Sequence, residues 1–114
     1  LLVIDPGYLL VADFSNGILS RINLISNEIE KVADGFGGGD GLAFSNKKLY
    51  VSDWRGGKLW GGTINGTQYN PKILKTGYVN PADICITSDG KNVVVPEMMK
   101  EKVDGGRVSF LPIN

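Results

Sequence analysis

Residues 40–64, DGLAFSNKKLYVSDWRGGKLWGGTI, decide the fold of this chain, because the sequence on either side contains altered copies of the same unit. The stretch has an apolar run at 42–44, a polar turn, and a second apolar run that ends in Asp53. A Gly-Gly turn and a third apolar run at 58–60 follow. Short apolar runs separated by turn residues predict three short strands joined by hairpins.

The upstream copy places Asp13 on Asp53 at an offset of forty residues, and the downstream copy places Glu97 there at an offset of forty-four. Some similarity of this kind is generic to all-β proteins. An acid that ends the second strand three times, each time before a turn and another apolar run, is hard to obtain by accident. A repeat of about forty to forty-five residues with about four short strands is typical of a β-propeller blade.

The sequence therefore predicts an all-β chain that is a β-propeller fragment, with about three four-stranded antiparallel blades. We place the blades at residues 1–34, 39–77 and 81–114, with the third lacking its outer strand, in one partial propeller over 1–114. A complete ring needs roughly four to eight blades. We expect missing N-terminal blades or further copies of the chain to close the ring, and exposed sheet edges to favour self-association if the chain is alone.

Composition excludes several function classes. The 12 basic and 12 acidic residues balance, which argues against nucleic-acid binding, and no apolar run is long enough for a membrane span. Histidine is absent, so Ser-His or Cys-His catalysis cannot be completed within the chain. The single cysteine, Cys85, is interpreted as a buried apolar side chain. We expect a secreted or periplasmic protein rather than a cytoplasmic one, with any signal peptide upstream.

The loops carry further predictions. Residues 34–41, DGFGGGDG, are expected to form a flexible crossing between blades whose backbone can approach a ligand closely. Residues 65–67, Asn-Gly-Thr, spell a glycosylation sequon but favour a hairpin turn. Residues 98–104 should form a longer loop than their counterparts. Repetition of the acids Asp13, Asp53 and Glu97 argues that they hold hairpins by accepting N–H bonds.

Blocks 38–60 (GGDGLAFSNKKLYVSDWRGGKLW), 81–96 (PADICITSDGKNVVVP) and 105–113 (GGRVSFLPI) resemble the SMP-30/gluconolactonase/LRE-like propellers and, more loosely, NHL-repeat propellers. This resemblance implies a six-bladed ring, of which the chain is similar to the last three blades. It also implies that the absent N-terminal part supplies the missing outer strand.

The same resemblance implies one divalent cation, such as calcium, in the central channel, with Asp40 as a metal ligand. The matching position in the third blade is Ala82, which cannot bind a metal, so Asn80 or Asp83 would have to substitute there. Alternatively, Asp40 satisfies backbone N–H groups of the glycine loop. The remaining ligand-binding candidates are Trp54 and Arg55, which suit a small anionic or sugar-like ligand, although Trp54 also suits packing between blades.

Two functions remain open. The first is non-catalytic binding of a small molecule or protein at the central funnel. The alternative is metal-dependent hydrolysis of a sugar lactone or similar ester. The sequence assigns no catalytic residue and leaves open whether the chain is an enzyme.

Overall fold

The computed structural model describes residues 1–99 and 105–113, and the regular structure in these residues is entirely β-strand. A search of these described residues finds no helix of the length and hydropathy needed to cross a bilayer. The strands are β1 (Leu2–Asp5), β2 (Tyr8–Asp13), β3 (Ile18–Asn23), β4 (Ile29–Ala33), β5 (Gly39–Ser45), β6 (Lys48–Asp53), β7 (Lys58–Asn65), β8 (Gln68–Tyr69), β9 (Lys72–Lys75), β10 (Cys85–Ile86), β11 (Asn92–Glu97) and β12 (Arg107–Pro112).

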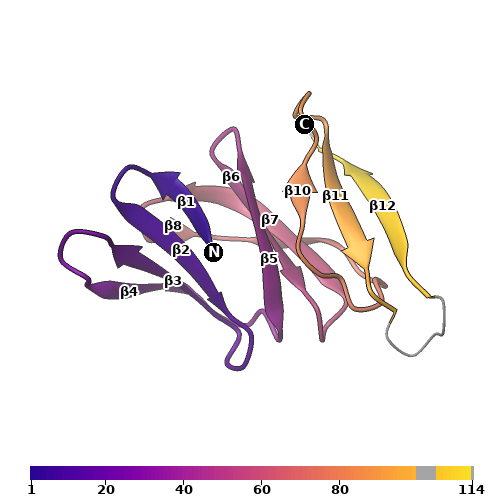
Figure 1. Cartoon of the computed structure of the whole chain (residues 1–114), viewed down its shortest axis with the longest axis horizontal. Coiled ribbons are helices and arrows are strands. Elements are labelled where there is room, and N and C mark those ends of the chain that lie inside the picture. The colour runs from indigo at the N-terminus through magenta and orange to yellow at the C-terminus, as the bar shows by residue number, and fades with distance from the viewer. Residues whose placement is uncertain (100–104, 114) are drawn as a thin grey trace.

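The strands form three antiparallel sheets that stand side by side along the molecule, from β4 at the left of Figure 1 to β12 at the right. The first sheet has the order β1-β2-β3-β4, in which each strand pairs with the next one in sequence. This meander follows from short connections, because hairpins join consecutive strands with little loop-closure cost. The prediction of an all-β propeller fragment is confirmed at the level of the fold.

The second sheet has five strands instead of the predicted four. Strand β7 is eight residues long, and its two ends have different partners. Its first half pairs with β9, while Ile64 and Asn65 at its end pair with Tyr69 and Gln68 of β8. The Asn-Gly-Thr segment therefore makes the predicted hairpin turn, and this small hairpin supplies the additional strand.

The third sheet has the order β10-β11-β12 among the described residues. Its innermost strand covers only Cys85 and Ile86, although the run from Ile84 to Thr87 predicts a longer strand. The loop expected at 98–104 lies mostly outside the described residues. The interpretation of Cys85 as buried is wrong: Cys85 is exposed, because strand alternation turns it away from its buried neighbour Ile84.

Two apolar cores hold the sheets together, one in each space between neighbouring sheets. The first core joins Leu10 and Leu19 of the first sheet to Leu49 and Val51 of the second, and all four are fully buried. The second core joins opposite faces of the second and third sheets. Its buried members are Ala43, Tyr50, Leu59, Tyr78, Ile84, Val93 and Val95.

The crossing from the first sheet to the second is packed into the first core, which corrects the prediction of a flexible segment. Phe36 is only 2% exposed. Its ring makes edge contact with Trp60 at 5.7 Å and stacks near Tyr69 at 6.5 Å, measured between ring centroids. A single aromatic residue thus anchors this glycine-rich segment, a consequence of burial that a glycine count does not reveal.

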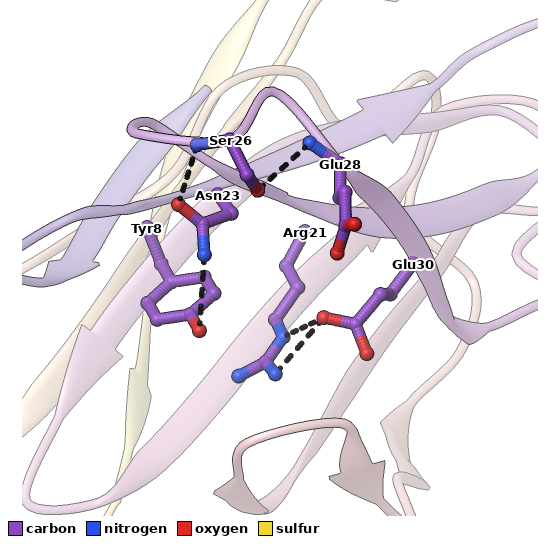
Figure 2. A network of polar contacts seen from close by, with 6 residues as sticks. All are labelled: Tyr8, Arg21, Asn23, Ser26, Glu28 and Glu30. Carbon is purple, nitrogen blue, oxygen red and sulfur yellow. Dashed lines mark hydrogen bonds and ion pairs between the residues drawn. The ribbon is translucent and has the colours of Figure 1, made fainter.

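The outer part of the first sheet carries a network of polar contacts (Figure 2). Arg21 donates from Nε and Nη2 to Oε1 of Glu30 at 3.1 and 3.0 Å, and its guanidinium lies 4.2 Å from the centroid of the Tyr8 ring. The Asn23 side chain accepts from the backbone N–H of Ser26 at 3.1 Å, which holds the turn between β3 and β4. These contacts organise the rim of the molecule, away from the loops described next.

Candidate functional site

The loops that enter the innermost strands and the loops that follow the middle strands lie together at one end of the sheets, which we call the funnel face. The backbone N–H of Trp54 donates to the carbonyl of Gly38 at 2.8 Å, and that of Met98 donates to the carbonyl of Asn80 at 3.0 Å. In the second and third sheets, these bonds join the end of the middle strand to the loop that enters the innermost strand of the same sheet. Gly38 and Trp54 of the second sheet, like Asn80 and Met98 of the third, therefore lie on this face.

The repeated acids anchor this surface, as predicted. Asp13 accepts from the backbone N–H of Ser15 at 2.9 Å and from the side chain of Asn16 at 2.8 Å. The hydrogen bond from the Asn16 side chain is the largest effect that lowers the pKa of Asp13. Asp53 is 2% exposed and accepts at Oδ1 from the N–H groups of Gly38 and Gly56, both at 2.8 Å. The carboxylates therefore hold turns and incoming loops in place.

Glu97 differs from the other two acids in its partners. Its carboxylate accepts from the backbone N–H of Val79 at 2.8 Å and receives two bonds from Arg107, at 2.6 and 2.9 Å. The hydrogen bond from Arg107 is the main reason that the pKa of Glu97 is lowered. Glutamate is one methylene longer than aspartate, and Glu97 connects Arg107 of β12 to Val79 in the loop that enters the third sheet. The alignment of the repeats does not predict this connection.

The residue that follows each acid lies on the funnel face, and together Phe14, Trp54 and Met98 form what we call the funnel ridge. The rings of Phe14 and Trp54 meet edge to face at a centroid distance of 5.8 Å. The indole Nε1 of Trp54 lies 3.4 Å from the sulfur of Met98 and donates to it. The funnel ridge therefore runs continuously across all three sheets.

Arg55 lies over this ridge. Its guanidinium carbon is 4.4 Å from the centroid of the Phe14 ring, in cation–π geometry, and the residue is exposed. A side chain on Gly38 would meet Arg55 and Phe14 at 2.9 and 3.1 Å, so only glycine lets the loop pass beneath this pair. The glycine is covered by protein side chains rather than open to a ligand.

The structure is compatible with both predicted roles of Trp54, packing between blades and contact with a ligand. It packs between sheets, through Phe14 on one side and Met98 on the other. It also remains only partly buried on the face that carries Arg55. The alignment of the repeats predicts that Phe14 and Met98, which follow the repeated acids, share this face with Trp54, but it does not predict that the three side chains touch.

Asp40 and Asp83 come close to each other where the innermost strands of the second and third sheets meet. A side chain on Gly41 would meet the backbone of Ile84 at 2.6 Å and the Cα of Asp83 at 2.8 Å, so the two chains touch here. Partial burial, and then the negative charge of Asp83, raise the pKa of Asp40, while the amino terminus lowers it. Within the glycine loop, whose N–H groups Asp40 was a candidate to bind, the amide of Gly38 donates to Asp53.

Ser52, which sequence reasoning missed, fixes this junction. Its hydroxyl is fully buried, accepts from the N–H of Gly41 at 2.8 Å and donates to the carbonyl of Ala82 at 2.7 Å. One side chain of the second sheet therefore ties its own innermost strand to the third sheet. No repeat signal pointed to it, since the matching positions are Ala12 and Pro96.

The described residues supply a carboxylate pair but not a complete metal cage. No group of three or more potential acidic, histidine or cysteine ligands forms within residues 1–99 and 105–113. Calcium takes six to eight oxygen ligands, of which Asp40 and Asp83 offer carboxylate oxygens of the right chemistry. Asn80 lies in the adjoining loop with a left-handed φ of 54°, and its carbonyl is already bound by Met98.

A separate groove lies away from the funnel face. It has a volume of about 630 Å³ and is formed between the outer part of the second sheet and the end of β12. Tyr50, Gly61 and Leu74 are among its lining residues, and Lys48 and Lys72 contribute positive charge. None of the predicted site residues lines it, so it is separate from the funnel face.

Side-by-side antiparallel sheets whose innermost strands meet, with loops gathered at one end, define a β-propeller fold. Among solved structures, a chain of the nidogen/laminin complex is similar, with a TM-score of 0.75 and 19% identity over 93% of this chain and 40% of that one. A luciferin-regenerating enzyme gives 0.66 and 17% identity over 95% of this chain and 43% of that one. Hydrazine synthase of Kuenenia stuttgartiensis gives 0.65 and 22% identity over 78% and 25%.

These identities support the fold alone. The chain spans less than half the length of each of these structures. Its sequence matches no known protein-family profile and no curated protein. The resemblance to the SMP-30/gluconolactonase propellers, and the six-bladed ring it implies, therefore stay predictions.

Proposed function

We propose that this chain forms part of the binding face of a β-propeller and that the funnel ridge, with Arg55, contacts a small anionic or sugar-like ligand. The supporting observation is the arrangement of Phe14, Trp54 and Met98 in one continuous line, with an exposed guanidinium held over it. Aromatic faces favour sugar rings and planar groups, and a positioned arginine favours carboxylates. Neither role needs a catalytic residue.

Gluconate is a suitable probe because it combines a sugar-like chain with a carboxylate. We expect Arg55→Ala to weaken gluconate binding, measured by calorimetric titration, about tenfold or more, since a hydrogen bond to a charged group contributes about 1.5 to 3 kcal/mol. The control is Lys91→Ala, which removes an exposed cation from the turn before β11, at the other end of that strand. Equal binding by both variants would show that the ligand does not use the funnel face.

The carboxylate pair favours a second function, metal-dependent hydrolysis of a sugar lactone or similar ester. A divalent cation held in part by Asp40 and Asp83 would supply Lewis acidity at the channel. The two side chains would hold that ion, with its remaining ligands from water or from further blades. Their mutual repulsion, which contributes to the raised pKa of Asp40, would then be relieved.

Calcium titration separates the two functions. Asp40→Asn and Asp83→Asn should each weaken calcium binding about tenfold or more, because calcium affinity follows the number of charged ligands. Asp5→Asn, which changes an exposed acid at the far end of β1, should leave calcium affinity unchanged. Absence of δ-gluconolactone turnover with any divalent cation would eliminate the hydrolase and leave the binding function.

A further inference from the structure

The outward face of the third sheet is apolar and uncovered. Cys85 pairs with Val94, and Val94 with Phe110, so these three side chains share one face. Pro96 and Val108 form another pair on the same face. Phe110 is 60% exposed and Val108 is 59% exposed, which is unusual for large apolar side chains at paired strand positions.

The first sheet has a second uncovered apolar face, at the opposite end of the molecule. Val3 pairs with Leu9, Leu9 with Ile22, and Ile22 with Ile29, which places all four side chains on one face. Val3 is 62% exposed and Ile29 is 68% exposed. Val11 lies two residues after Leu9 on β2 and therefore belongs to this face as well.

The interior of the molecule shows what covers such faces. By the repeat offset, Leu9 and Val11 match Leu49 and Val51 of the second sheet, which are fully buried against the first sheet. The matching pair in the third sheet, Val93 and Val95, is fully buried against the second. The matching faces of the second and third sheets are therefore each covered by the sheet that precedes them. The face of the first sheet is equivalent to these two but has no preceding sheet in the structure.

We propose that the two uncovered faces pack against each other between two copies of this chain, head to tail, and close a ring of six sheets. The third sheet of one copy covers the first sheet of its partner, and the same contact forms a second time. Two copies of the three sheets described here make six, a number within the roughly four to eight blades of a closed ring.

The mass of the chain in solution tests this arrangement. The wild-type chain of 12.3 kDa should sediment as a discrete species of twice that mass at about 50 µM. Val11→Glu and Phe110→Glu should each weaken association at least about a hundredfold, because each leaves an unpaired charge in both apolar contacts. Both positions lie outside the two internal cores, and circular dichroism verifies that the strands are retained. Ile25→Glu is the matched control, since Ile25 is 91% exposed in a turn.

Mixing the two interface variants distinguishes this geometry from a symmetric face-to-face pair. A mixed dimer of Val11→Glu and Phe110→Glu keeps one contact fully wild type, so mixing should restore association that neither variant shows alone. A face-to-face pair would instead be broken by one variant and unaffected by the other.

Cys85 provides an independent readout. As the single cysteine, on the face that becomes covered, it should react with a thiol reagent more slowly as the protein concentration rises. The proposal is overturned by a wild-type chain that stays monomeric at about 50 µM, by open-ended polymers, by equal effects of Ile25→Glu, or by mixing that restores nothing.

Discussion

The three repeated acids show how one position can perform two tasks. Asp13 closes the turn that follows its strand, whereas Asp53 and Glu97 also bind the N–H of the incoming loop. In Glu97 this contact is reinforced by Arg107, which is 55% exposed at its side chain while the carboxylate is almost fully buried. A buried carboxylate with several donors stabilises the fold only while it is ionised.

Stability should therefore depend on the ionisation of Glu97. Its pKa is lowered from 4.5 in the folded state, so its stabilisation is present above the unfolded value and is lost as the pH falls through the folded value. We expect Glu97→Gln to lower the free energy of unfolding by about 2 kcal/mol at neutral pH. The difference from wild type should shrink as the pH falls below 4.5 and through the lowered pKa of the folded state, as measured by urea denaturation at neutral and at acidic pH.

Glu30→Gln is the matched control for this prediction. Its ion pair with Arg21 is a partly exposed rim contact at 3.0 Å, so its removal should cost less than about 1 kcal/mol at neutral pH. A pH-independent effect of Glu97→Gln would assign the loss to packing instead of charge.

At the scale of elements, the junction between β5 and β10 sets the geometry of the channel. Gly41 permits the close contact with the backbone of residues 82–84, and the Ser52 hydroxyl bridges Gly41 and Ala82 by hydrogen bonds. The neighbouring backbone atoms leave no room for a side chain at Gly41, and backbone cannot move aside as a flexible side chain can. This contact is therefore sensitive to a single methyl group.

Gly41→Ala should lower the free energy of unfolding by about 1 to 3 kcal/mol through overpacking. Gly39→Ala, two residues earlier on the same strand, should change it by less than about 0.5 kcal/mol, because its methyl group would meet Ala12 at an ordinary 3.5 Å. Urea denaturation with a common slope measures both. Equal losses would mean that strand propensity, and not the contact with the third sheet, dominates.

At the scale of the whole molecule, the second sheet is covered on both faces and the first and third sheets on one each. A single blade cannot bury both of its apolar faces, so stacking supplies most of the stability of such repeats. The uncovered apolar faces at the two ends are the direct consequence. We propose that these two faces cover each other when two copies close a ring.

Much of this organisation was predictable from sequence because strand periodicity and turn chemistry are local. The offsets that align Asp13, Asp53 and Glu97 located the hairpins, and the loops at the funnel face follow from that alignment. The candidate residues Trp54 and Arg55 could be placed on one face for the same reason. The hairpin turn at residues 65–67 was predictable, but the extra strand β8 was not, because an Asn-Gly turn does not say which strand its residues will join.

The sequence alone determined that this protein is an all-β chain of repeated hairpins with an acid at the end of each middle strand, since these properties depend on residues near one another along the chain. Only the tertiary structure decided that Phe36 is an anchor, that Cys85 is exposed, that Ser52 joins two sheets, and that the charge of Asp83 reaches Asp40. These properties depend on which face of each sheet packs against its neighbour. Contacts between residues distant in sequence settle that question, and the local pattern is compatible with either outcome.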